Sequence, residues 1–378
     1  MNWRVPLTKL ELSDEEVESA LEAVRSEWLT MGPRTQALEA AFAEYTGSEH
    51  VVAVSSGTAA LHLACLAAGV GPDDEVIVPA MTFVATAHAP RNCGATAVLC
   101  DSVGTLDPAL DPAAVEALIN DRTRAVIAVH LCGYPAAIEE LRAICERRGV
   151  ALIEDCAQAA GARYGPGASR VGKEAIAGCF SFFSKTQLGV GEGGAVTAQD
   201  ADVADRVRSL RSHAMTTVTW DRHRGHAETY DVTDLGFNYR IDELRAALAH
   251  ARLEALDGGL ARLREVAEGY RRRLADVDGI ELPFAAEAVE WSGHFAFPVL
   301  LADLQTRDAV RERLHEEGVQ TTFYPALTQL AEYRDAAPDG AARAEQFADR
   351  HCALPLSPSL ADEELDIVAG ALADSLAA

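Results

Sequence analysis

The sequence lacks the long apolar run that a membrane span requires. No apolar stretch approaches the length that crosses a bilayer. Residues 1–6 also lack the charged-then-apolar pattern of a secretion signal. We therefore expect a cytoplasmic protein that does not insert into a membrane.

Basic charge is scarce. The chain has 33 Lys and Arg against 58 Asp and Glu, which gives a formal net charge of -25 at pH 7. This balance argues against nucleic acid or an anionic membrane as a general partner, although a local basic pocket could still hold a phosphate.

Paired cysteines are absent. The eight cysteines are scattered, mostly in apolar runs, with no CxxC pair and no spacing typical of zinc ligands. We predict reduced core thiols in a cytosolic protein, and no metal site.

What the chain does contain is an alternation of strand and helix patterns. Short apolar runs at 50–54, 75–79, 95–100, 125–131 and 151–155 are separated by helical patterns. This order predicts a largely parallel sheet covered on both faces, with a site at the strand ends. We expect one helix running through Ala247 and Leu253, then a separate helix over 260–274. A smaller α+β unit would follow, which divides the chain into domains 1–256 and 257–378.

Residues 179–196 contain the most suggestive stretch. An apolar run ends at Ser184 and Lys185, and a glycine-rich turn leads into a second strand-like run. An amine at a strand end beside flexible backbone is how a Schiff-base lysine is presented to a carbonyl cofactor. The alternative is a solvated lysine in a hairpin loop.

Two further positions fit a cofactor. Gly57 and Thr58 open an apolar helix directly after a strand, where free backbone N–H groups suit a phosphate, although the same residues could simply cap the helix. Asp155 ends a buried strand, where an ionised acid needs a cationic partner such as a protonated pyridine nitrogen. A helix N-cap or a salt bridge to an arginine is the alternative there. Together with an aromatic ring at Phe83 and the amine of Lys185, these residues predict a pyridoxal-phosphate site.

A polar segment follows at residues 213–226. Five polar or aromatic residues crowd its second half without clean periodicity: Trp220, Arg222, His223, Arg224 and His226. The pattern favours a loop that binds an anionic substrate, and guanidinium groups match phosphate oxygens in bidentate fashion. A solvated polar loop is the alternative.

These residues resemble a known family, the DegT/StrS aminotransferases of fold-type I, which act in sugar and aminocyclitol biosynthesis. The resemblance covers nearly the whole chain and rests on residues 28–33, 55–61, 82–86, 154–158, 180–183, 191–194 and 236–240. It implies a three-layer α/β sandwich with a mainly parallel seven-stranded sheet, and a smaller C-terminal α+β domain.

The resemblance also implies roles for individual residues. It makes Gly57, Thr58 and Ser181 phosphate contacts, Phe83 the stacking ring, Asp155 the pyridine partner, Gln158 a contact to the ring, and Asn238 and Arg240 contacts to the neighbouring subunit's site. The implied unit is a homodimer with shared active sites.

Two positions depart from the family pattern. Thr186 stands where the family has its lysine, and Lys185 comes one residue earlier. Neighbouring residues on extended backbone point to opposite faces, so Lys185 would need a local rearrangement to reach the cofactor. In the stretch that begins at Tyr324, a predicted substrate contact, Thr328 replaces a common histidine.

Three functions remain open. The first is a pyridoxal-phosphate-dependent aminotransferase that moves an amino group from glutamate or glutamine to a nucleotide-linked keto-deoxy sugar in secondary-metabolite biosynthesis. Lys185 would form its Schiff base. The resemblance of residues 220–226 favours a dTDP-4-keto-6-deoxyhexose, and an inosose or another secondary-metabolite ketone is the alternative substrate. The second is a lysine-less enzyme that uses noncovalent pyridoxamine phosphate or no cofactor, with Thr186 in the lysine position and His213 or His226 as the base. The third is a catalytically silent binding partner.

Overall fold

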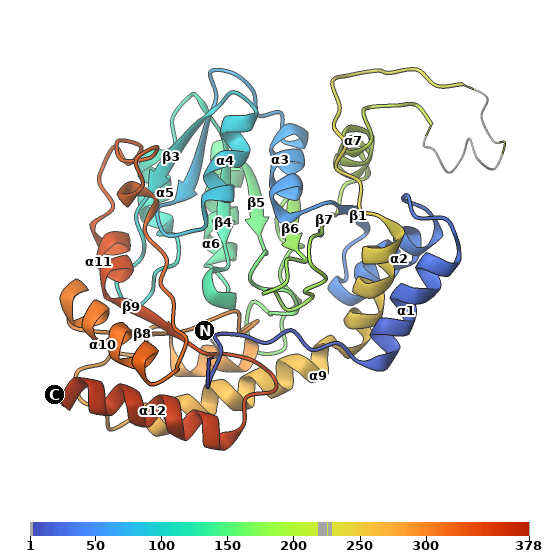
Figure 1. Cartoon of the computed structure of the whole chain (residues 1–378). Coiled ribbons are helices and arrows are strands. Elements are labelled where there is room, and N and C mark those ends of the chain that lie inside the picture. Colours follow the sequence, from blue (N-terminus) through green and yellow to red (C-terminus); the bar gives the residue numbers. More distant parts are fainter. Residues whose placement is uncertain (1–2, 218–224, 226–228, 378) are drawn as a thin grey trace.

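The centre of the protein is one seven-stranded sheet (Figure 1). The computed structural model describes residues 3–217, 225 and 229–377. The strand order is β1-β7-β6-β5-β4-β2-β3. The strands are β1 (His50–Val54), β2 (Glu75–Pro79), β3 (Thr96–Cys100), β4 (Thr123–Val129), β5 (Ala151–Asp155), β6 (Ala177–Ser181) and β7 (Gly194–Ala198).

Neighbouring strands from β6 through β5, β4 and β2 to β3 are parallel, whereas β7 runs antiparallel to both β6 and β1. The mainly parallel seven-stranded sheet predicted from the sequence is therefore confirmed. Because these strands are parallel, the carboxyl ends of β2, β4, β5 and β6 share one edge of the sheet.

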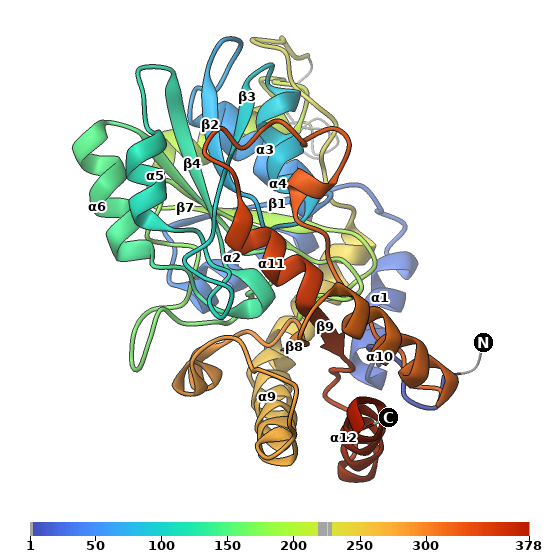
Figure 2. The same cartoon turned by 90° about the vertical axis from the view of Figure 1, so that its left-hand side faces the viewer.

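The two faces of the sheet are covered by different helices, as Figure 2 shows. Alternation along β1 illustrates the division: Val52 and Val54 pack with the cluster that contains α3, whereas Val51 and Ala53 pack with α2 and α9. The helices of the large unit are α1 (Asp14–Arg25), α2 (Pro33–Thr46), α3 (Gly57–Ala67), α4 (Val84–Asn92), α5 (Pro112–Leu118), α6 (Ile138–Arg148) and α7 (Ala201–Arg211).

Helix α9 (Glu243–Leu274) is one continuous helix of 32 residues, not the two helices that the sequence predicted. Gly258 and Gly259, which have low helical preference, lie between the two predicted helices. The helix continues because Leu256 and Leu260, on either side of the glycines, are both buried in the same core. The division into domains at 256/257 stays a prediction, and its boundary falls inside this helix.

The C-terminal part contains a two-stranded antiparallel sheet of β8 (Phe297–Leu300) and β9 (His351–Leu354). Its helices are α10 (Leu304–Glu316), α11 (Ala342–Arg350) and α12 (Asp362–Ala377), and three short 3-10 turns, η1 (Leu131–Gly133), η2 (Ala286–Trp291) and η3 (Leu327–Gln329), complete the described elements. Among the residues that the structure describes, no helix is both long enough and apolar enough to cross a membrane.

Candidate cofactor site

Asp155 ends β5 at the carboxyl edge of the sheet, and only 5% of it is exposed. One carboxylate oxygen accepts a hydrogen bond from Thr86 Oγ1 at 2.8 Å, and the other accepts one from the Ala157 N–H at 3.1 Å. Burial raises the pKa of Asp155, because these neutral donors only partly replace water. No ion pair to this carboxylate forms within the described part of the chain. The acid is therefore suited to a buried cationic partner.

Phe83 lies at the start of α4, the helix that supplies the Thr86 hydroxyl bound to Asp155. It is the N-cap residue of α4, with 64% of it exposed, and Thr86 follows on the first turn of the same helix. The Thr82 and Thr86 hydroxyls, 2.9 Å apart, tie this turn together. An exposed aromatic ring thus stands one helical turn from the partner of Asp155, where a planar ligand could stack on it.

The predicted phosphate residues meet at the N-terminus of α3. Ser56 caps this helix, its Oγ accepting from the Ala59 N–H at 3.1 Å, so the first N–H groups, those of Gly57 and Thr58, have no partner within the helix. Gly57 lies so close to Ser181 that an added Cβ would stand 2.8 Å from the serine Cβ. The structure therefore brings Gly57, Thr58 and Ser181 to one corner, where the helix dipole favours an anion.

Gln158 is held in the turn that follows Asp155. Its Oε1 accepts from the Cys132 N–H at 2.7 Å, and its backbone carbonyl accepts from Gln187 Nε2 at 2.7 Å. These bonds fix the side chain and leave its amide NH2 group for another partner. Gln187 thereby links the lysine loop to the turn after β5.

Thr186, at the family's lysine position, forms hydrogen bonds only with backbone groups of its own loop among the described residues. Its Oγ1 lies 2.9 Å from the Ser181 carbonyl and 2.8 Å from the Phe183 carbonyl, so the hydroxyl proton is shared between two acceptors. Residues 183–186 form a turn instead of the extended backbone on which the sequence argument relied. Thr186 stabilises this turn and offers no amine.

Lys185 is exposed and faces a different set of residues. It lines a hollow of about 510 Å³ between the N-terminal segment 8–13 and α9, together with His294 and Phe295. It also lines a smaller hollow with Tyr324. None of the described residues predicted to hold the cofactor lines either hollow. In this structure the lysine thus shares a hollow with Tyr324, and Asp155 lines neither hollow.

Tyr324 is positioned by a buried histidine on β9. The Tyr324 N–H donates to His351 Nε2 at 2.9 Å, and the two rings stack with 5.9 Å between their centroids. Burial lowers the pKa of His351 to about 4 and raises that of Tyr324. Thr328, at the other departure from the family pattern, donates to Glu345 at 2.6 Å.

The buried acid, the exposed ring and the phosphate corner together fit a phosphorylated nitrogen heterocycle. The family model described as the DegT/DnrJ/EryC1/StrS aminotransferase family matches residues 11–373. The chain belongs to this aminotransferase family.

Known relatives of this aminotransferase are similar over almost their whole length. The erythromycin biosynthesis sensory transduction protein EryC1 of Saccharopolyspora erythraea is 39% identical over 368 residues, which are 96% of each chain. The aminotransferase TlmJ of Streptoalloteichus hindustanus has a similar structure, with a TM-score of 0.90, 32% identity and 99% of each chain covered. DesV of S. venezuelae, solved in complex with a ketimine intermediate, gives a TM-score of 0.89, 35% identity and 98% coverage of each chain.

Several predicted residues of this aminotransferase make no hydrogen bond to Asp155 in the described part of the chain, or lie outside it. Trp220, Arg222, His223, Arg224 and His226 all belong to the undescribed segments, so their roles stay predictions. His213 is exposed, and its N–H donates to the Phe237 carbonyl at 2.9 Å. It therefore stands beside segment 236–240, which carries the exposed Asn238 and the half-buried Arg240. Their contacts to a neighbouring subunit also stay predictions.

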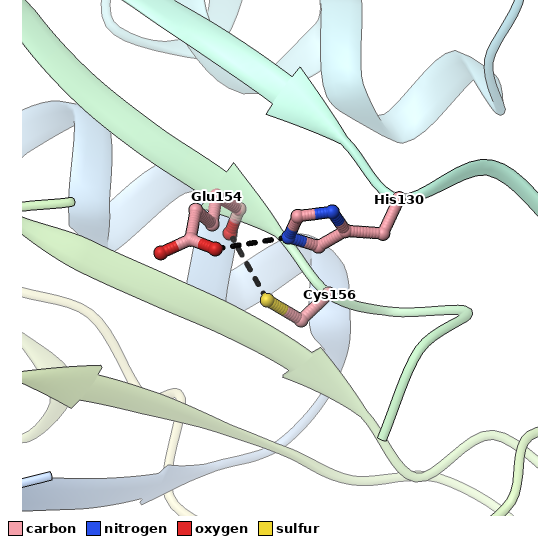
Figure 3. A group of neighbouring side chains, drawn as sticks. All are labelled: His130, Glu154 and Cys156. Atoms are coloured by element: carbon pink, nitrogen blue, oxygen red, sulfur yellow. Dashed lines mark hydrogen bonds and ion pairs between the residues drawn. The ribbon is translucent and has the colours of Figure 1, made fainter. Parts of the chain in front are cut away.

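Figure 3 shows a buried cluster that sequence reasoning missed. His130, after β4, and Glu154, next to Asp155 on β5, are fully buried, and His130 Nε2 lies 2.9 Å from a Glu154 oxygen. The Tyr164 hydroxyl donates to the same oxygen at 2.5 Å. Burial alone would raise the pKa of Glu154, but the hydrogen bonds from His130 and Tyr164 hold it below its usual value. The only signal in the sequence was the acid that precedes Asp155.

The same cluster is poorly suited to a metal ion. His130 Nδ1 accepts from the Ala136 N–H at 3.0 Å, so Nε2 carries the proton and donates to Glu154. Burial raises the pKa of the Cys156 thiol well above its usual value. Neither ring nitrogen offers a lone pair and the sulfur keeps its proton, so the cluster acts as a hydrogen-bonded brace behind Asp155.

Proposed function

We propose that this chain binds pyridoxal or pyridoxamine phosphate and transfers an amino group from glutamate or glutamine to a nucleotide-linked keto-deoxy sugar. The observation that carries the proposal is the carboxylate of Asp155, buried without an ion-pair partner among the described residues and one helical turn from the exposed ring of Phe83. A protonated pyridine nitrogen supplies the missing positive charge.

Each residue then has a physical task. The N–H groups of Gly57 and Thr58 and the Ser181 hydroxyl hold the phosphate, while Phe83 covers one face of the ring and keeps water away from it. Asp155 keeps a proton on the ring nitrogen. When bound, the cofactor supplies an electron-withdrawing ring that acidifies the carbon bearing the amino group.

The proposed sugar is a dTDP-4-keto-6-deoxyhexose. Support comes from relatives at more than 30% identity, since the name of EryC1 places it in erythromycin biosynthesis and TlmJ is an aminotransferase. Arg222 and Arg224 would bind the diphosphate, because guanidinium groups pair with phosphate oxygens in bidentate fashion.

A second function is favoured by one observation in the lysine loop. Thr186 is held to two carbonyls of its own turn, and Lys185 lines a hollow without the cofactor residues. A cofactor bound at Asp155 would then be held without a covalent bond, and the enzyme would perform chemistry other than ordinary transamination. A histidine such as His213 or His226 would be its base.

The deciding experiment is an absorption titration with pyridoxal phosphate, followed by borohydride reduction and tryptic mapping. Reduction onto Lys185 blocks cleavage there and joins residues 174–185 and 186–206 into one labelled peptide. Such a peptide supports amino transfer through Lys185. Saturable binding without a labelled peptide supports the second function, and the variant Thr186→Lys should then become labelled at position 186.

The absence of saturable binding to either the pyridoxal or the pyridoxamine form would overturn both functions. The third function, a catalytically silent binding partner, would then remain. The variant Lys185→Met is the matched control, because it removes the only lysine of the loop and leaves Thr186 in place.

We also propose that the functional unit is a homodimer. Val17, Leu21 and Val24 are each more than 40% exposed at helical spacing on α1, although exposed stripes of this kind are unusual on a monomer. Light scattering should give about twice 40.3 kDa for the native chain. Leu21→Glu should shift the mass towards the monomer, and a native mass of one chain would contradict the proposal.

A further inference from the structure

The hollow between the N-terminal segment 8–13 and α9 has the features of a second ligand site. Its volume is about 510 Å³, and small-molecule sites typically enclose about 300–1,000 Å³. Side chains of the lysine loop form one part of its wall, and leucines of α9 form another. The hollow therefore combines polar and apolar surface.

Lys185 supplies a positive charge to this wall that no described residue neutralises. The other charged side chains of the wall pair with each other. Lys9 pairs with Glu11, and Arg252 Nη1 lies 3.0 Å from a Glu16 oxygen. The exposed Lys185 amine makes neither an ion pair nor a hydrogen bond to any residue in the described part of the chain. The hollow thus has a net positive charge and favours an anion.

The wall near the lysine also contains polar atoms whose hydrogen bonds are not made. His294 is only 4% exposed, and its Nε2 has no partner among the described residues. The same is true of Gln187 Oε1, although Gln187 Nε2 donates to the Gly293 carbonyl at 2.6 Å. His294 also has a φ of 51°, in the left-handed region that non-glycine residues rarely adopt. Unmet hydrogen bonds and backbone strain cost stability, and both concentrate at ligand-binding sites.

The apolar part of the wall comes from two elements. Leu10 and Leu12, on segment 8–13, are each more than 40% exposed. Helix α9 contributes Leu256, Leu260 and Leu263, which share one face of the helix because they recur at helical spacing. An apolar ligand chain would remove the exposed leucines from water, which stabilises the complex.

We propose that this hollow binds a small carboxylate with an apolar chain. The carboxylate pairs with the Lys185 ammonium group, and the chain covers Leu10 and Leu12. An amine that pairs with a carboxylate stays protonated, so it cannot attack an aldehyde. The ligand therefore competes with Schiff-base formation at Lys185, and an occupied hollow holds the lysine in an unreactive state.

The test is isothermal titration of the full chain with octanoate, without added cofactor or sugar. Octanoate should bind saturably with one molecule per chain. Octanamide has the same chain length and a neutral head, so it should bind at least about tenfold more weakly. Hexanoate should bind about tenfold more weakly because it buries two fewer CH2 groups. Equal affinities for octanoate and octanamide, or no saturable binding of octanoate, would overturn the proposal.

Variants of the wall assign the binding to this hollow. Lys185→Met should lower octanoate affinity to that of octanamide, whereas Lys173→Met is the matched control because Lys173 does not line the hollow. Leu12→Ser should lower octanoate affinity about threefold. Its control is Leu304→Ser on α10, since both leucines are 43% exposed and only Leu12 lines the hollow. Native affinity in Lys185→Met would mean that the carboxylate pairs elsewhere, and the proposal would fail.

Lysine labelling gives a second readout that does not depend on variants. Reductive methylation with formaldehyde and cyanoborohydride needs an unprotonated amine, so saturating octanoate should slow labelling of Lys185 several-fold. Labelling of Lys173 in the same sample should not change, and peptide mass spectrometry measures both sites. An unchanged rate at Lys185 would contradict the proposed ion pair.

Discussion

Two sides of the candidate site differ in how completely they are built. The acid side, made of Asp155, Phe83, Gly57, Thr58 and Ser181, brings a buried acid, an exposed ring and free backbone N–H groups to one edge of the sheet. On the lysine side, Lys185, Phe295 and Tyr324 line separate hollows, and the buried His351 holds the Tyr324 backbone. The groups that we propose to hold the cofactor therefore gather at one edge of the sheet, whereas Lys185 lines hollows that none of them lines.

The difference means that different parts of the chain position the residues proposed to hold the cofactor and the amine proposed to react with it. Helix ends and strand ends define the acid side, and each is fixed by many backbone bonds. The lysine side depends on one turn, in which Thr186 bonds to Ser181 and Phe183.

Among the variants considered, substitution of Asp155 should lower cofactor affinity the most. Asp155→Asn removes the charge that a protonated ring nitrogen needs, so cofactor affinity should fall about 10³-fold, or about 4 kcal/mol. Because burial raises the pKa of Asp155, the charged acid destabilises the empty protein, and the variant without cofactor should melt at a higher temperature. Absorption titration and calorimetry measure the two effects.

The control for that experiment is Asp257→Asn, which changes an exposed carboxylate paired with Arg170. It should leave cofactor affinity unchanged. If Asp155→Asn binds the cofactor as tightly as the native chain, the acid side is not the cofactor site.

The lysine side should be the more sensitive to acid. The pKa of His351 is about 4 in the folded chain and about 6.5 when unfolded, so only the unfolded state gains a proton as the pH falls between these values. Stability of up to about 3 kcal/mol present above pH 6.5 should be lost by pH 4. Urea unfolding at several pH values measures the loss.

His351→Gln should flatten this pH dependence, whereas the exposed His88→Gln should leave it unchanged. An equally steep loss in His351→Gln would place the acid sensitivity elsewhere, for example at His294, whose pKa burial also lowers to about 4.

A methyl group at the phosphate corner should test its close packing. In Gly57→Ala the new Cβ would stand 2.8 Å from Ser181 Cβ, so the chain should lose about 2 kcal/mol of stability and bind phosphate less tightly. Gly71→Ala is the matched control, because no atom lies within 4 Å of its added Cβ. Equal melting temperatures for the two variants would contradict the packing described for α3.

The smallest effect is expected at Lys185. Lys185→Met should change the affinity for pyridoxamine phosphate less than about twofold, because the side chain lines a hollow without the cofactor residues. Absorption titration of the variant beside Thr186→Lys gives the comparison. A loss greater than tenfold would mean that the loop rearranges and that Lys185 joins the acid side.

Local patterns in the sequence were enough to single out Asp155 and Gly57, whereas the role of Ser181 stays a prediction from the family resemblance. Asp155 after an apolar run and Gly57 opening a helix are features of neighbouring residues, and strand ends converge in any parallel sheet. The brace of His130 and Glu154 was not predictable, because the two residues come from different strands and nothing in their spacing marks them. The turn at Thr186 was missed for a different reason, since the sequence argument assumed extended backbone.

The long helix α9 has a mechanical consequence. It runs unbroken for roughly 48 Å, from directly after segment 236–240 to the C-terminal part of the chain. At its first turn, Glu243 accepts hydrogen bonds from the N–H groups of Gly32 and Thr35 at 2.8 and 2.9 Å, which anchors the helix to the start of α2. A hinge near Asp257 would break helical hydrogen bonds, so α9 acts as a stiff lever. Bending between the large sheet and the C-terminal part of the chain is then confined to the two ends of α9. The N-terminal end of α9, which Glu243 anchors, lies next to segment 236–240, which carries Asn238.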